Sequence, residues 1–140
     1  MTSTSSAPRG DDEVAVALLA DLGTFPGATR ADLAAIVAAG YVVSVPQGWS
    51  LIWDRTPADK AYVILDGTVE VRRDDEVVAT LTAGQVIGEV AILRRQLRSA
   101  TVTATTQLTV LHFGRETVER LYAEVPAVRD ALVASAEAHS

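Results

Sequence analysis

The middle of the chain is a succession of short runs of β-branched and aromatic residues, separated by turn-forming residues. Between residues 41 and 113 the runs are YVVSV, SLIW, AYVIL, TVEVR, VVATL, SATVTA and LTVLHF. Many short strands with regular turns are typical of antiparallel sandwiches and barrels. The pattern predicts a mainly β fold, an antiparallel β-roll or jelly-roll-like barrel. One hairpin stands out in GTVEVRRDDEVVATL, where valines alternate with charged residues and Asp74-Asp75 turns the chain.

Helices are expected on both sides of these strands. Residues 13–22 predict a first helix. Thr29 begins a second, with Asp32 at the spacing of a capping box and Gly40 as its stop signal. The Ser/Thr-rich residues 1–12 predict a disordered leader, so that residues 13–140 form one domain, as the length allows.

The strands are interrupted once, at residues 89–94, where EVAILR contains no turn residue and predicts a short helix. After Gly114 the helical pattern returns, first in RETVERLYAEV and then beyond Pro126. The 14 residues that follow Pro126 predict a short final helix.

Composition excludes several classes of function. A formal net charge of −6 argues against nucleic-acid binding, which needs a basic face, and against binding to an anionic membrane surface. The absence of cysteine excludes disulfides, thiolate chemistry and Cys-ligated zinc. Short strands also permit a cupin-like metal enzyme, but two histidines cannot supply its usual site. We therefore expect a protein that is not an enzyme, has no metal or other cofactor, and resides in the cytoplasm.

The stretch GEVAILRRQLRSATV, residues 88–102, contains the chemistry of a binding site. A helix that begins after Gly88 would expose free N–H groups to an anion. The guanidinium of Arg98 matches phosphate oxygens, and Ser99 adds a hydroxyl. Glu89 is acceptor-only and fits only if the ligand also has hydroxyl donors. A phosphate and a ribose hydroxyl on one compact ligand satisfy both charges, which favours nucleotides, and small cyclic ones above all.

This stretch resembles the phosphate-binding cassette of the cyclic-nucleotide-binding domain family, which includes catabolite activator proteins and regulatory subunits of cAMP-dependent kinase. The family pattern is Gly-Glu, a few apolar residues, a variable loop and then Arg-(Ser/Thr/Ala)-Ala. The resemblance extends over roughly residues 14–138, through LLADLGTF, AYVILDGTVEV, LTAGQVIGE and ERLYAEVPAV. It implies the β-roll fold with a short helix in the cassette, and cAMP or cGMP as the ligand.

The resemblance also implies a role for each site residue. Glu89, beside Gly88, would accept a hydrogen bond from the ribose 2′-hydroxyl, and Arg98 would pair with the cyclic phosphate. The N–H groups of Ala91 and Ser99 would complete the phosphate cradle. The remaining candidates are two further cassette residues and two walls of the base or sugar pocket: Val90, Ala100, Val71 and Leu81. These residues leave open whether the base is adenine or guanine.

Other residues receive simpler interpretations. Arg94 and Arg95 lie in the variable loop, where we expect solvent-exposed charges or a lip that steers the anion. Trp49 and Trp53 are expected to be packing residues, and His112 is expected to face outward from its strand.

These observations leave two alternative hypotheses for the function. The first is a sensor that binds a cyclic nucleotide, changes its C-terminal helix and passes that change to a separate effector protein. The second is a ligand-free protein-interaction module on the same fold. Two copies could also pair through the C-terminal helix as a homodimer.

Overall fold

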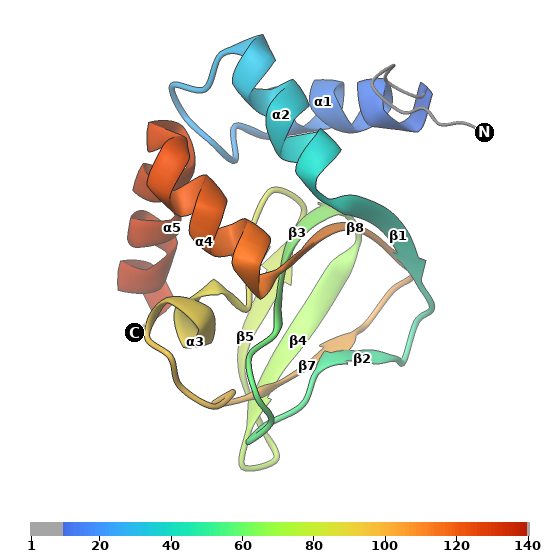
Figure 1. The fold of residues 1–140 in the computed structure, drawn as a ribbon. Helices are drawn as coiled ribbons and strands as arrows, with labels where there is room; N and C mark the ends of the chain where they lie inside the picture. The colour runs from blue at the N-terminus through green and yellow to red at the C-terminus, as the bar shows by residue number, and fades with distance from the viewer. Residues whose placement is uncertain (1–9, 140) are drawn as a thin grey trace, which may run out of the picture.

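The computed structural model describes residues 10–139 (Figure 1). Helix α1, Gly10–Leu22, begins three residues before the predicted start at residue 13. The remainder of the predicted leader, residues 1–9, lies outside the described residues. Among the residues described, no helix is long and apolar enough to cross a membrane.

Within residues 10–139, eight strands form two antiparallel sheets of four strands each. The first sheet has the order β1-β8-β3-β6, and its strands are Tyr41–Val45, Leu108–Gly114, Lys60–Asp66 and Val86–Ile87. The second has the order β2-β7-β4-β5, and its strands are Ser50–Ile52, Thr101–Ala104, Thr68–Arg73 and Glu76–Thr82. The mainly antiparallel β fold with flanking helices is therefore confirmed, and the two sheets stay open instead of closing into a barrel.

The predicted hairpin is formed by β4 and β5, which pair from Thr68↔Thr82 to Arg73↔Glu76. The two residues of its turn, Asp74 and Asp75, both have positive φ angles, 53° and 65°. Two-residue turns with positive φ match the twist of the flanking strands, and aspartate is among the residues that tolerate this conformation.

The second N-terminal helix, α2 at Arg30–Ala39, begins as predicted. The Asp32 N–H donates to the Thr29 hydroxyl at 3.0 Å, and the Thr29 N–H donates to the Asp32 carboxylate at 3.0 Å. This reciprocal pair satisfies two N–H groups that lack partners within the helix. Gly40 ends α2 at a point where the Phe113 side chain leaves no room for a Cβ.

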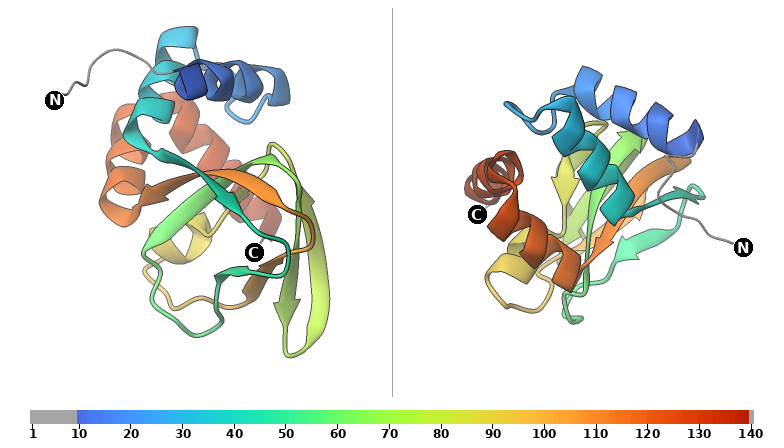
Figure 2. Two further views of the ribbon diagram at one scale, coloured as in Figure 1. Left: turned by 90° about the vertical axis from the view of Figure 1, so that its right-hand side faces the viewer. Right: turned by 45° about the horizontal axis from the view of Figure 1, so that its top comes forward.

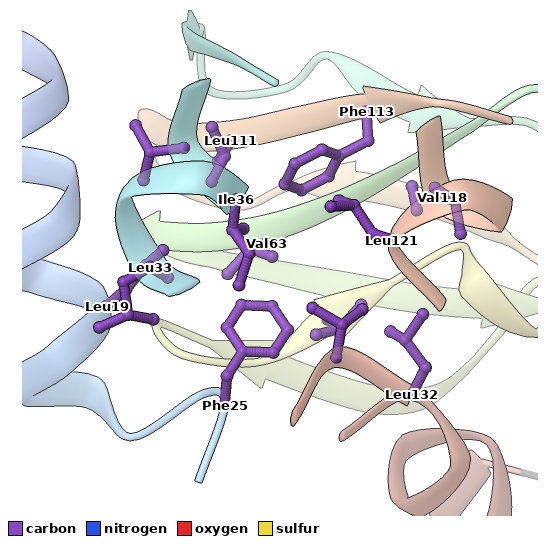
Figure 3. Close-up of a cluster of buried hydrophobic side chains, with 14 of the residues drawn as sticks. Leu19, Phe25, Leu33, Ile36, Val63, Leu111, Phe113, Val118, Leu121 and Leu132 are labelled. Carbon is purple, nitrogen blue, oxygen red and sulfur yellow. The ribbon is translucent and has the colours of Figure 1, made fainter. Parts of the chain in front are cut away.

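Helices α4, Arg115–Glu124, and α5, Pro126–His139, follow the last strand (Figures 1 and 2). Together with α1 and α2 they cover one face of the first sheet and enclose an apolar core with it. Figure 3 shows the centre of this core, where Leu19, Phe25 and Ile36 from the N-terminal segments meet Leu121 and Leu132 from α4 and α5. The helices are thus attached to the sheet by buried apolar area, the main favourable term in folding.

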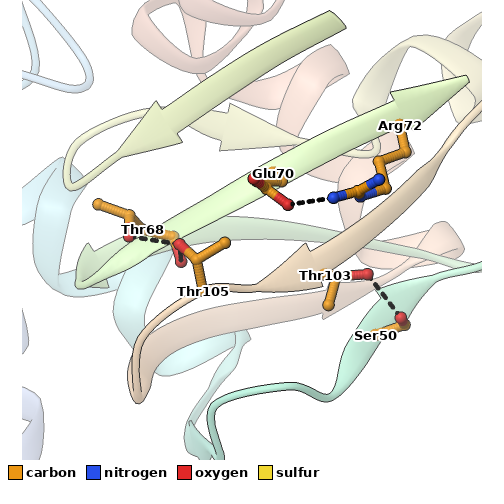
Figure 4. A network of polar contacts seen from close by, with 6 residues as sticks. All are labelled: Ser50, Thr68, Glu70, Arg72, Thr103 and Thr105. Atoms are coloured by element: carbon orange, nitrogen blue, oxygen red, sulfur yellow. Dashed lines mark hydrogen bonds and ion pairs between the residues drawn. The ribbon is translucent and has the colours of Figure 1, made fainter. Parts of the chain in front are cut away.

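A second apolar core lies between the two sheets and includes Ile64, Val69 and Val110. The outer face of the second sheet is polar instead (Figure 4). There the residues that alternate with the core positions pair with one another: Ser50 with Thr103 at 2.8 Å, Thr68 with Thr105 at 2.7 Å, and Arg72 with Glu70 at 3.0 Å. Alternate residues of a strand point to opposite faces, so the other residues of these strands face inward and can line a cavity.

Two expectations for aromatic residues differ from the structure. Trp49 and Trp53 do not pack in the core, and they are 66% and 60% exposed, because they flank the short edge strand β2. His112 does not simply face outward. It is half-buried and stacks on its cross-strand neighbour Tyr41, with 5.4 Å between the ring centroids.

Candidate functional site

A pocket of about 330 Å³ lies between the inner face of the second sheet, the short helix α3 (Glu89–Leu93) and the end of α5. All the residues predicted from the sequence line it: Val71, Leu81, Gly88, Glu89, Val90, Ala91, Arg98, Ser99 and Ala100. The predicted residues thus gather around one space. Helix α3 itself confirms the single helical segment expected within the strands.

Gly88 precedes α3 in the left-handed conformation, with φ of 87°. A Cβ at this position would lie 2.9 Å from Nη1 of Arg98 and 3.0 Å from the carbonyl oxygen of Lys60. Both the φ angle and this crowding require glycine. The close approach lets the Arg98 guanidinium lie directly against the backbone that begins the helix.

Arg98 is 5% exposed, and its guanidinium points into the protein. Nη1 donates to the Gly88 carbonyl at 2.6 Å, and Nη2 donates to the Lys60 carbonyl. Its backbone is also fixed, because its N–H donates to the Thr56 carbonyl at 2.9 Å and its carbonyl accepts from the Arg55 N–H at 2.8 Å. Arg98 therefore joins α3 to β3, and its guanidinium is a fixed positive charge at the bottom of the pocket.

Burial shifts the pKa values of Arg98 and of its neighbour Tyr62. It lowers the pKa of the Arg98 guanidinium, and the nearby Tyr62 and Asp59 act in the opposite direction. It raises the pKa of the Tyr62 hydroxyl, which donates to the Leu51 carbonyl at 3.3 Å. A guanidinium does not lose its proton in proteins at neutral pH, so Arg98 remains a cation.

Glu89, the first residue of α3, is 1% exposed. Its carboxylate accepts a hydrogen bond from the hydroxyl of Ser135 on α5. Ala138, one turn further along α5, lines the same pocket. The last turns of α5 therefore lie beside α3, as Figures 1 and 2 show, and touch the residue that the sequence predicted to bind a hydroxyl.

Comparison with known proteins agrees with this geometry. The family model described as cyclic nucleotide-binding domain matches residues 42–125, more than half of the chain. The chain belongs to the cyclic nucleotide-binding domain family. The resemblance carried by the cassette and the strand motifs is thus confirmed.

Individual relatives of this cyclic nucleotide-binding domain include kinase regulators. The chain is 37% identical over 112 residues to the cAMP-dependent protein kinase regulatory subunit of Yarrowia lipolytica. That match covers 79% of the chain and 28% of the relative, so the chain spans about a quarter of that protein's length.

Two solved structures share the fold. A structure of Sp-2Cl-cAMPS bound to PKAR CBD2 superposes with a TM-score of 0.73 at 20% identity, covering 86% of this chain and 88% of that one. The regulatory subunit of a cAMP-independent protein kinase A from Trypanosoma brucei has a TM-score of 0.79 at 20% identity, covering 90% of this chain and 46% of that one. At 20% identity, both likenesses show the shared fold.

The structure adds pocket residues that the sequence interpretation missed. Most are apolar neighbours on the inner face of the second sheet or next to it: Ile52, Val78, Ala79, Ile87 and Val102. Arg73 is the polar addition, and its position two residues after Val71 on β4 was a usable signal for it. Ala138 had no local signal, because only the packing of α5 brings it to the pocket.

The variable loop of this cyclic nucleotide-binding domain points away from the pocket. Arg94 and Arg95 are exposed and do not line it. Arg95 lies 4.0 Å from the Glu119 carboxylate on α4, a contact between exposed side chains that contributes little stability. Arg98 thus differs from the other arginines of the cassette in burial, in hydrogen bonding and in access to the pocket.

Proposed function

We propose that the chain is a regulatory domain that binds a cyclic nucleotide, cAMP or cGMP, and passes the bound state to a separate effector protein. The observation that carries this proposal is the meeting of Glu89 and Arg98, an acceptor and a donor, in one pocket beside the start of α3. A ligand with a ribose hydroxyl and a phosphate complements the two groups. Membership of the cyclic nucleotide-binding domain family supports the same ligand class.

In this proposal Arg98 binds the exocyclic oxygens of the cyclic phosphate. A guanidinium has more N–H donors than the two that engage the Gly88 and Lys60 carbonyls, so it can hold the loop and the phosphate together. The N–H groups of Ala91 and Ser99 and the Ser99 hydroxyl complete the phosphate site. Val71 and Leu81 form apolar walls for the base or the sugar.

The regulatory step uses α5. Glu89 is proposed to accept the ribose 2′-hydroxyl, yet in this structure it accepts the Ser135 hydroxyl. The two hydroxyls would then compete for one buried carboxylate, so ligand binding would weaken the hold of α5 on α3. A ligand can shift a conformational equilibrium only through such a difference in contacts between the two states. The released helix would be the surface that an effector protein recognises.

Calorimetric titration of the purified chain with cAMP and with cGMP tests the proposal, and a lack of heat at millimolar ligand contradicts it. Arg98→Ala should weaken binding strongly, because loss of a buried charged partner typically costs ~2–5 kcal/mol. Since Arg98 also braces two carbonyls, Arg98→Lys serves as a second variant that retains the charge. Thermal melting of both variants without ligand reports whether they fold.

Arg94→Ala is the matched control. It removes an arginine from the same cassette, but one that is exposed and outside the pocket. Binding should stay at the wild-type level in this variant. If Arg94→Ala weakens binding as much as Arg98→Ala, the attraction comes from general charge and the assignment of Arg98 is wrong.

The alternative is the ligand-free interaction module. It predicts that wild-type protein binds no cyclic nucleotide and that Arg98→Ala leaves partner binding unchanged. Pairing of two copies through α5 stays a prediction, which sedimentation of the free and the ligand-saturated protein can test.

A further inference from the structure

Arg73 lies at the rim of the pocket, at the end of β4. Its Nε donates to the Ser99 carbonyl at 3.1 Å, so the hairpin is joined to the residue that follows Arg98. This bond uses Nε alone and fixes the direction of the guanidinium. The N–H groups on Nη1 and Nη2 remain as further donors on the same planar fork.

The neighbouring residue, Arg72, provides a contrast within the same strand. Its Nη2 donates to Glu70 at 3.0 Å on the outer face of the sheet, as Figure 4 shows, and it does not line the pocket. Val71 and Arg73, on either side of it, both line the pocket. The alternation of the strand thus directs one of two adjacent arginines to the ligand space and the other away from it.

Arg73 belongs to the side of the pocket formed by the β4–β5 hairpin, which we assign to the nucleobase in the proposed binding mode, and its Nε reaches the Ser99 carbonyl at the border with the phosphate site. Its neighbours on the lining are the apolar residues Val71, Val78 and Ala79 of the β4–β5 hairpin. The proposed phosphate site lies instead at the start of α3, where Arg98 contacts the Gly88 carbonyl. Arg98 is buried at the bottom of the pocket, whereas Arg73 is exposed at its rim and meets the phosphate site through the Ser99 carbonyl.

The chemistry of a guanidinium selects among purines. It offers donors only, in a fork that matches two adjacent acceptors. The guanine edge presents N7 and O6, both of which are acceptors, whereas the adenine edge presents the N7 acceptor beside the N6 amino donor. Arginine can form a bidentate pair with the first edge and not with the second.

Building on the proposed cyclic-nucleotide function, we propose that Arg73 is a specificity-determining residue that binds the O6/N7 edge of the base and favours 6-oxopurine cyclic nucleotides, such as cGMP, over cAMP. The contact with Ser99 orients the guanidinium for this pair. Arg73 thereby decides the choice of base that the cassette residues leave open.

The test is calorimetric titration of wild-type protein, Arg73→Ala and Arg72→Ala with cGMP, cAMP and cyclic inosine monophosphate. The inosine nucleotide retains O6 and N7 and lacks the 2-amino group, so it isolates the acceptor pair. We expect wild-type protein to bind the two 6-oxopurines about tenfold more tightly than cAMP, the scale of discrimination by one bidentate pair at a base edge. Arg73→Ala should remove this preference by lowering the affinity for the two 6-oxopurines more than the affinity for cAMP, and Arg72→Ala should preserve it.

The outcomes separate this inference from the proposed function. Wild-type protein that binds all three nucleotides equally well, or an Arg73→Ala variant that loses affinity for all three to the same extent, overturns the assignment of Arg73 and leaves the proposed function standing. Wild-type protein that binds none of them overturns both. Arg73→Lys retains the charge without the fork, so a full preference for cGMP in this variant would contradict bidentate recognition.

Discussion

The hydroxyl of Ser135 on α5 donates a hydrogen bond to the buried carboxylate of Glu89 on α3, across 46 positions of the chain. This bond ties the final helix to the first residue of the cassette helix. It places a protein hydroxyl on the group that we propose to bind the ribose hydroxyl of a nucleotide. In the proposed binding mode, the affinity of the site for its ligand would therefore depend on the position of α5.

Removal of the Ser135 hydroxyl should strengthen nucleotide binding. In Ser135→Ala the ligand no longer displaces a competing donor, and a hydrogen bond to a charged group contributes about 1.5–3 kcal/mol. We expect the affinity for the preferred cyclic nucleotide to rise about tenfold. The melting temperature without ligand should fall at the same time, because a buried carboxylate loses a donor. Calorimetry and thermal melting measure the two effects.

Ser135→Thr is the control for this experiment, since it retains a hydroxyl at the same position. Its affinity should stay near that of the wild type. An unchanged affinity in Ser135→Ala, together with a lowered melting temperature, would show that the bond is structural only and that α5 does not compete with the ligand.

Gly88→Ala should destabilise the fold and disturb the Arg98 side chain. The alanine would adopt a φ near 87° and place its Cβ 2.9 Å from Nη1 of Arg98. A residue held in a sparsely populated backbone region costs roughly 1–3 kcal/mol, and the steric clash adds to this cost. The free energy of unfolding in urea measures the sum, and ligand titration reports whether Arg98 still functions.

Gly48→Ala measures the backbone part alone, so its comparison with Gly88→Ala isolates the steric part. Gly48 has nearly the same φ, 90°, but nothing lies within 4 Å of the Cβ that alanine would add. This variant should lose only the backbone term and bind nucleotide like the wild type. Equal losses of stability in the two variants would mean that the crowding around Gly88 relaxes without cost.

Local sequence signals predicted the elements and the charged cassette residues Glu89 and Arg98, whereas Ala91, Val71 and Leu81 came from the family resemblance. The capping box at Thr29, the turn at Asp74-Asp75 and the short helix after Gly88 depend on residues close together in the chain, so patterns predicted them. The pocket residues on alternating positions of β4 follow from strand geometry.

Long-range packing was beyond such patterns. No local feature indicates that Ser135 meets Glu89, or that Arg98 donates to the carbonyl of Lys60, 38 positions away. Similarly, the aromatic character of Trp49 and Trp53 suggested burial, but the position of β2 at a sheet edge leaves both exposed. These details depend on how the two sheets and α5 come together.

Thr29→Ala should lower stability without affecting the ligand site. The variant removes the hydroxyl that accepts the Asp32 N–H, and loss of an N-cap side chain typically costs about 1 kcal/mol. Thr29→Ser keeps the acceptor and should restore most of the loss. Urea unfolding of the two variants measures the effect, and a similar loss in both would attribute it to something other than the cap.

His112 should make the fold less stable as the pH falls below neutrality. Burial lowers the pKa of its imidazole below the ordinary value of 6.5, with Lys60 acting in the same direction. Because the unfolded chain then binds the proton more readily than the folded one, protonation favours unfolding. The stabilising effect of the neutral ring is fully present above the unfolded pKa. It declines as the pH falls, and levels off below the folded pKa.

His112→Phe tests this dependence. Phenylalanine retains a ring that can stack on Tyr41 and removes both the titration and the buried Nδ1 atom, which has no hydrogen-bond partner among the described residues. Urea unfolding of both proteins between about pH 5 and pH 7 should show a smaller decline in stability for the variant. Other groups titrate in both proteins, so the difference between the two curves reports His112. Parallel curves would mean that His112 titrates alike in the folded and unfolded chains.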